Sequence, residues 1–162
     1  MRLRGGLVVV ALALACGPKG GADSVEIEPG WECNNRRMAY ELTGGFGAHI
    51  TGVAATCDEA GPRVSLIRQE TADSERVVKH QSVGSRTYDE LWEAIDSTGW
   101  RQLTDCDYLG LDSDPRYVII IGDHASSTQV KCAAEGSATN KKLPFPYDNI
   151  VNELDLAAGG LR

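Results

Sequence analysis

Five cysteines carry the most reactive side chains in this chain of 162 residues: Cys16, Cys33, Cys57, Cys106 and Cys132. A thiol can bind a metal, form a disulfide or accept a covalent group, and the spacing of the cysteines distinguishes these outcomes. Zinc sites typically use Cys-x-x-Cys pairs, and the chain contains no such pair. We therefore expect neither a metal ion nor another cofactor. Cys16 stands apart because an apolar run precedes it.

The first fifteen residues have the pattern of an export signal. Arg2 and Arg4 precede an apolar run at 7–15, which is about half the length of a membrane-spanning helix of about 20 residues. The segment Leu12-Ala13-Leu14-Ala15-Cys16 resembles the lipobox of bacterial lipoproteins, in which the cysteine is lipidated and becomes the mature amino terminus. The alternative is an ordinary secretory signal in which Cys16 merely lies near the cleavage point.

The lipoprotein resemblance implies both an organisation and a location. It makes 1–15 a signal peptide, 16–30 a lipidated amino terminus with a tether, and 31–162 a single folded domain. Gly17, rather than an aspartate, follows the cysteine, which by the same resemblance implies sorting to the outer membrane of a bacterial cell envelope. The expected partners are the membrane, through lipid on Cys16, and another envelope or secreted protein.

The chain is acidic, which excludes some partners. It has 16 Lys and Arg against 23 Asp and Glu, a net charge of −7, and removal of residues 1–15 takes away two arginines and leaves −9. Nucleic acids and anionic lipids favour basic surfaces. We therefore expect no nucleic acid partner.

Four cysteines remain after Cys16, an even number that predicts two disulfides in an oxidising compartment. Four cysteines allow three connectivities. A hairpin that turns at 44–47 would place Cys57 opposite Cys33, and a second hairpin that turns at 122–125 would bring Cys132 into one unit with Cys106. The preferred pairs are therefore Cys33–Cys57 and Cys106–Cys132.

Alternating β-prone segments and two apolar stripes of helical spacing predict an α+β domain. We expect strands at 38–43, 49–54, 63–69, 75–83, 117–121 and 128–132, paired as three hairpins. Thr87 and Glu90 form a capping-box pattern at the first helix, and Pro146 suits the start of the second. The helical stripes are Tyr88, Leu91, Trp92 and Ile95, and then Tyr147, Ile150, Val151 and Leu154. The expected fold is an antiparallel sheet built from hairpins, with two helices packed on one face.

Few residues could form a catalytic site. Asp123, His124 and Ser126 offer an acid, a base and a hydroxyl, but neighbours on a tight turn do not point their side chains into one relay. His49 and His80 fall on predicted strands without a second motif. Four aspartates lack the Asp-x-Asp-x-Asp-Gly pattern of a calcium loop: Asp105, Asp107, Asp112 and Asp114. We predict that the protein is not an enzyme.

A second resemblance concerns the body of the chain. The run Gly44-Gly45-Phe46, a later helix with Leu91-Trp92 and the strand pair around 117–121 are similar to emfourin-type proteins, which include inhibitors of thermolysin-like metalloproteases. This resemblance makes Phe46 the candidate partner contact. The leading hypothesis is a lipid-anchored binding or interaction module whose ligand is unknown. The alternatives are an inhibitor of a secreted metalloprotease and an envelope hydrolase that uses its histidines.

Overall fold

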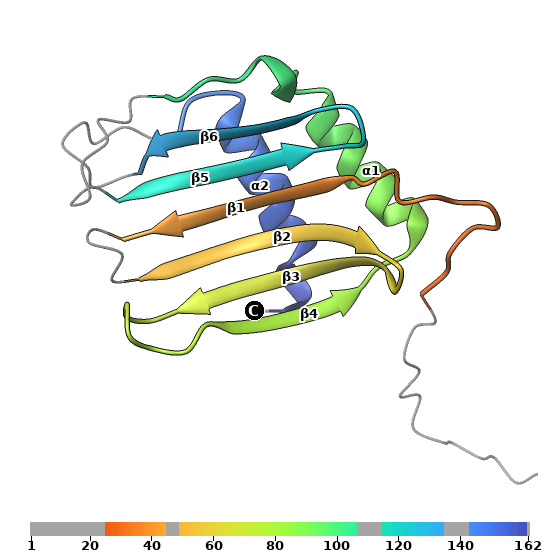
Figure 1. Ribbon diagram of the computed structural model, residues 1–162, viewed down its shortest axis with the longest axis horizontal. Coiled ribbons are helices and arrows are strands. Elements are labelled where there is room, and N and C mark those ends of the chain that lie inside the picture. Colours follow the sequence, from red (N-terminus) through yellow and green to blue (C-terminus); the bar gives the residue numbers. More distant parts are fainter. Residues whose placement is uncertain (1–24, 45–48, 107–114, 135–142, 162) are drawn as a thin grey trace, which may run out of the picture.

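A computed structural model describes residues 25–44, 49–106, 115–134 and 143–161, which form a six-stranded antiparallel sheet with two helices on one face (Figure 1). The strands are β1 (Arg37–Thr43), β2 (Ile50–Asp58), β3 (Gly61–Gln69), β4 (Val77–Ser82), β5 (Arg116–Gly122) and β6 (Ser127–Ala133). The helices are α1 (Ser85–Asp96) and α2 (Tyr147–Ala157), with short 3-10 helices η2 (Trp100–Gln102) and η3 (Gly159–Leu161). The α+β class is confirmed.

The sheet has the strand order β4-β3-β2-β1-β5-β6. Sequential strands form the three predicted hairpins, and β1 joins the two parts of the sheet because it pairs with both β2 and β5. Figure 1 shows α1 and α2 behind the sheet, so its opposite face is turned to the viewer. The predicted order of strand pairs and helices is therefore confirmed.

The core lies between the sheet and the helices. The register places Met38 between Ala55 and Ile121, so alternate residues of neighbouring strands share the helix-covered face. Trp92 is 7% exposed and Trp100 is fully buried, and both belong to this core. Burial of each large apolar side chain stabilises the fold by about 1.5–3 kcal/mol.

The first helix begins earlier than its capping pattern predicts. α1 starts at Ser85 with Gly84 as its N-cap, so Thr87 lies inside the helix and the predicted Thr87–Glu90 capping box is wrong. The chain preceding β1 supplies the reason. The Ser85 backbone N–H donates to the Glu26 carbonyl at 3.0 Å, and the Ser85 hydroxyl accepts from the Glu28 backbone N–H at 3.0 Å. A distant segment therefore satisfies the helix start in place of a local side chain.

Both preferred disulfides are present. The Cα atoms of Cys33 and Cys57 are 5.5 Å apart, and those of Cys106 and Cys132 are 4.6 Å apart, within the range for a disulfide. Cys132 is fully buried on β6, whereas Cys33 lies just before β1 and is half-buried. The Cys33–Cys57 bridge therefore joins the segment before β1 to β2, and the Cys106–Cys132 bridge joins the segment before the β5–β6 hairpin to β6.

Candidate functional site

Two of the residues singled out by the sequence, Cys16 and Phe46, lie outside the described residues, as do Asp107, Asp112 and Asp114. The hairpin that contains Phe46 is closed by Gly44 and His49, since the Gly44 backbone N–H donates to the His49 carbonyl at 2.7 Å. The partner contact at Phe46 therefore stays a prediction.

The histidines are not brought together. His49 follows the β1–β2 turn, His80 lies on the edge strand β4 and His124 lies in the β5–β6 turn, and all three are exposed. These positions are on separate elements of the fold. No shared site for them follows from the described geometry.

Asp123 holds the β5–β6 turn together. Its Oδ1 accepts from the backbone N–H groups of Ala125 and Ser126, both at 2.8 Å, and its Oδ2 accepts from the Arg101 guanidinium at 2.5 Å. Burial pushes the pKa of Asp123 upward, but these hydrogen bonds and the Arg101 charge outweigh it and hold the pKa below its ordinary 3.8. The Asp123 carboxylate therefore has a structural role: it stabilises the β5–β6 turn and forms an ion pair with Arg101.

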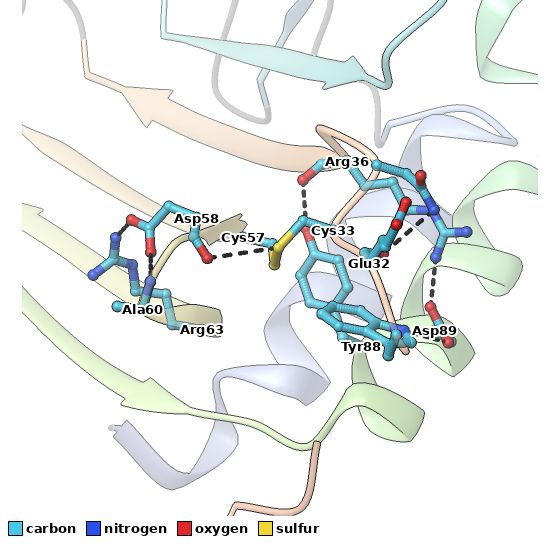
Figure 2. The surroundings of a disulfide bond; sticks show 11 residues. Glu32, Cys33, Arg36, Cys57, Asp58, Ala60, Arg63, Tyr88 and Asp89 are labelled. Atoms are coloured by element: carbon cyan, nitrogen blue, oxygen red, sulfur yellow. Dashed lines mark hydrogen bonds and ion pairs between the residues drawn. A yellow bond between two sulfur atoms is a disulfide. The ribbon is translucent and has the colours of Figure 1, made fainter. Parts of the chain in front are cut away.

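The segment before β1 is fastened to the start of α1. The Trp31 indole N–H donates to Asp89 at 2.8 Å, and its ring packs edge-on against Tyr88 with 5.9 Å between centroids. Figure 2 shows Tyr88, Asp89 and Arg36 gathered beside the Cys33–Cys57 disulfide. Helix, disulfide and amino-terminal segment are thus joined at one end of the sheet.

Arg36 completes this attachment. Its guanidinium donates to Asp89 at 2.5 Å and lies 5.5 Å from the centre of the Trp92 ring, while its backbone carbonyl accepts from the Tyr88 hydroxyl at 2.5 Å. Burial raises the pKa of the Tyr88 hydroxyl well above its ordinary value, and the Arg36 charge offsets this only in part. Tyr88 therefore remains a protonated donor at physiological pH.

The opposite end of the sheet carries a cleft. The register aligns Leu42 with Thr51 and with Tyr117, and Thr51 with Arg68, in a row near the far end of the strands. A cavity of about 310 Å³ lies between this row and α2. Its lining residues are Tyr40, Leu42, Thr51, Leu66, Arg68, Tyr117, Val151 and Asp155, and we call this set the far-end cleft.

Two tyrosines and a carboxylate define the chemistry of the far-end cleft. The Tyr40 and Tyr117 rings have centroids 5.9 Å apart and are tilted by 53°. The Tyr40 hydroxyl donates to Asp155 Oδ1 at 2.5 Å, which links β1 to α2. A second, shallower hollow of about 510 Å³ is lined by Asn152, Leu156, Gly159 and the same Asp155. Asp155 therefore stands at the border of both hollows.

The sequence does not predict the far-end cleft. Tyr40, Arg68 and Asp155 lie on β1, β3 and α2, so only the sheet register and the crossing of α2 bring them together. One signal was available in the sequence: Asp155 falls in the last turn of α2, which contains no Lys or Arg. A carboxylate at that helix end opposes the helix dipole.

Comparison with known proteins gives no family for this chain: no protein-family model matches it, and no curated protein matches it. Within 25–44, 49–106, 115–134 and 143–161, no group of three or more His, Cys, Asp or Glu side chains is placed to hold a metal ion. Across those same ranges, no helix has the length and apolar character needed to cross a bilayer.

Proposed function

We propose that the protein is a lipid-anchored binding module of the bacterial cell envelope, attached through Cys16 and engaging a ligand or partner at the far-end cleft. The lipobox resemblance of Leu12 to Cys16 supports the anchor. The observation that carries the proposal is the separation of two features. The amino-terminal segment is fastened at one end of the sheet, and the cleft lies at the other end.

The length of the tether gives this separation its meaning. Glu26 and Glu28 lie inside the predicted 16–30 segment but are hydrogen-bonded to Ser85 of α1. The tether is therefore counted here as the eight residues 17–24, between Cys16 and the first described residue, Val25. A chain of this length reaches at most about 30 Å when fully extended. The attachment of Glu26 and Trp31 at α1 would then turn that end of the sheet toward the membrane. The far-end cleft would face the surrounding space, where a partner can reach it.

The other properties of the chain agree with an exported protein. Two disulfides persist in oxidising compartments and are rare in the cytosol. The net charge of −9 that remains without residues 1–15 favours solubility next to an anionic surface and disfavours lying flat on it. Lipid on a single cysteine with more than one acyl chain gives stable anchoring, since each buried methylene contributes about 0.8 kcal/mol.

The mass of the intact protein, extracted from membranes of the cells that make it, tests the anchor. We expect a mass that lacks residues 1–15, carries acyl groups and rises by four hydrogens when both disulfides are reduced. The Cys16→Ala variant should lose the acyl groups and leave the membrane fraction, whereas Cys33→Ala should keep them. An unacylated, full-length wild-type chain in the soluble cell fraction contradicts the proposal.

A partner search tests the binding role separately. Crosslinking of the anchored wild-type protein in intact cells should return the same envelope or secreted partner, or the same small ligand, in repeated experiments. The Tyr117→Ala variant removes a cleft wall at a half-buried position and should weaken capture. Capture that is unaffected by Tyr117→Ala would place the binding surface outside the far-end cleft.

A further inference from the structure

We infer that the exposed edge of β4 binds an extended, acidic polypeptide segment, which adds to the six-stranded sheet as a further strand. The inference goes beyond the proposed function, because it assigns a second binding surface and the chemistry of its partner. It follows from the open backbone of β4, from the contrast with the other edge of the sheet, and from the charges of β3 and β4.

β4 is the last strand on one side of the sheet (Figure 1). The Val83 backbone N–H donates to the Pro62 carbonyl at 3.1 Å, so the residues of β4 at every second position from Val83 turn their backbone groups toward β3. The residues between them turn their backbone groups outward, where none of the described residues bonds to them: Val78, His80 and Ser82. Such an edge can bind an extended peptide by strand addition.

The opposite edge of the sheet, at β6, is closed. The Cys106 backbone N–H donates to the Lys131 carbonyl at 2.9 Å, and the Cys106 carbonyl accepts from the Ala133 backbone N–H at 3.3 Å. The Cys106–Cys132 disulfide fastens this covering segment in place. On β4, by contrast, Val78 is 50% exposed. Of the two edge strands, β4 is therefore the one that is open to a partner.

The charges of this edge favour an acidic partner. The ionisable side chains of β3 and β4 are all basic, in a chain with 23 acidic residues against 16 Lys and Arg: Arg63, Arg68, Lys79 and His80. Arg63 forms an ion pair with Asp58, whereas the described residues provide no ion-pair partner for the other three. The register makes Lys79 and Arg68 diagonal neighbours on the helix-covered face. The acids of the adjoining turn, at 70–75, precede the strand, so we expect the carboxylates of the partner along β4 itself.

A second copy of this chain fits the edge less well. Two-fold pairing of β4 with another β4 must align outward-facing residues with one another. The two registers that pair most of the strand then place Lys79 opposite the same lysine, or His80 opposite the same histidine. Basic side chains directly opposite one another repel when charged. An acidic segment replaces this repulsion with attraction.

Fluorescence anisotropy with a labelled peptide tests the inference on the whole chain, extracted in a nonionic detergent, against a detergent-only blank. The probe is a peptide of the length of β4 that alternates glutamate and valine, with both ends blocked. One control peptide has lysine in place of glutamate, and another has proline in place of the central valine and so cannot complete the strand pairing. We expect saturable binding of the probe, at least tenfold weaker binding of the proline peptide and none of the lysine peptide.

Amide hydrogen exchange of the whole chain shows whether the bound peptide forms a strand. In the unbound chain, the outward N–H groups of Val78, His80 and Ser82 should exchange at least tenfold faster than those of Lys79 and Gln81, which are bonded to β3. Saturation with the acidic peptide should remove this difference. The alternation along β4 distinguishes strand addition from a ligand that merely lies over the strand.

Variants separate the charge of the edge from its backbone. Lys79→Gln should weaken binding of the acidic peptide about threefold. Gln129→Glu makes the same change in net charge at an exposed position of β6 and should change binding less than 1.5-fold. Val78→Pro removes an outward N–H that β3 does not use, so it should keep the far-UV circular dichroism of wild type and weaken binding at least tenfold. Val78→Ala keeps this N–H and should weaken binding less than threefold.

Three results would overturn the inference: no saturable binding of the acidic peptide, equally tight binding of the proline peptide, or equal exchange of outward and inward amides in the unbound chain. The third result would mean that a second copy or the segment 17–24 already covers the edge. A failure of the proposed function is distinguishable from these results. A chain without acyl groups on Cys16, or with partner capture that does not depend on Tyr117, would lose the proposed function and still bind the acidic peptide at β4.

Discussion

Removal of each disulfide separately should destabilise the protein by different amounts. The bridges close loops of similar length, because their cysteines are 24 and 26 residues apart. On the chain-entropy relation, each bridge therefore stabilises the fold by about 3.5 kcal/mol through its effect on the unfolded chain. Any difference between the two must come from the folded state.

The folded state distinguishes the bridges by burial. Cys132 is fully buried in the core, whereas Cys33 and Cys57 are both half-buried and Cys57 packs against the core. Replacement of Cys132 by alanine also removes a buried sulfur atom, which adds about 1 kcal/mol for lost packing. We expect a loss of about 3.5 kcal/mol in Cys33→Ala/Cys57→Ala and about 4.5 kcal/mol in Cys106→Ala/Cys132→Ala.

Urea denaturation of the whole chain, followed by far-UV circular dichroism, measures both losses under one buffer condition. The slope of unfolding free energy against urea should rise in each double variant, because the unfolded chain expands when a loop is opened. A folded domain of this size is stable by about 5–15 kcal/mol, so loss of both bridges should leave it close to its unfolding midpoint. A larger loss for the Cys33–Cys57 pair than for the Cys106–Cys132 pair would refute the burial argument.

Three further predictions concern single residues. Trp31→Ala should lower the unfolding free energy by about 1–2 kcal/mol, because it removes the hydrogen bond to Asp89 and the ring contact with Tyr88. It should also speed proteolysis near the amino-terminal end, and Trp31→Phe should lower the unfolding free energy less. An unchanged cleavage rate in Trp31→Ala would contradict the attachment of this segment to α1. Asp123→Asn should destabilise the protein more at pH 7 than at pH 3. A carboxylate whose pKa is lowered in the folded state stabilises the fold at pH values above its ordinary pKa of 3.8, and this stabilisation is lost as the pH falls through the pKa of the folded state. Equal losses of unfolding free energy at both pH values, measured by urea titration, would be inconsistent with the role of Asp123 in the turn. Gly52→Ala should lower the unfolding free energy by about 1–3 kcal/mol in thermal or urea unfolding, because the added Cβ would lie 2.3 Å from the Tyr40 carbonyl oxygen. Gly159→Ala is the control, since a Cβ added there meets no atom within 4 Å. Similar effects of the two substitutions would argue against the close β1–β2 contact at Gly52.

The parts of the fold that the sequence predicted are those governed by local signals. Turn residues mark the hairpins, and the apolar stripe from Tyr88 to Ile95 marks α1. The hairpin geometry also narrowed three disulfide connectivities to the pair that the structure contains. In each case the decisive residues are near one another in the chain or on one hairpin.

The parts that escaped prediction depend on contacts between distant segments. α1 begins at Ser85, earlier than predicted, because two residues far earlier in the chain bond to Ser85. The Glu26 carbonyl accepts from its backbone N–H, and the Glu28 backbone N–H donates to its hydroxyl. The far-end cleft has the same character, since Tyr40 and Asp155 meet only after the sheet has formed and α2 has crossed it. Neither pattern of residues is visible as a local motif.

The order of the disulfides along the chain has a consequence for biogenesis. Each cysteine of the folded domain pairs with its nearest neighbour in sequence, so the two loops follow one another and do not interlock. If the chain is exported from its amino terminus, as proposed above, Cys33 and Cys57 would emerge before Cys106 and could be oxidised together while the later pair is still inside the channel. Emergence in this order would favour the native pairing, and under that proposal we expect maturation without a disulfide isomerase.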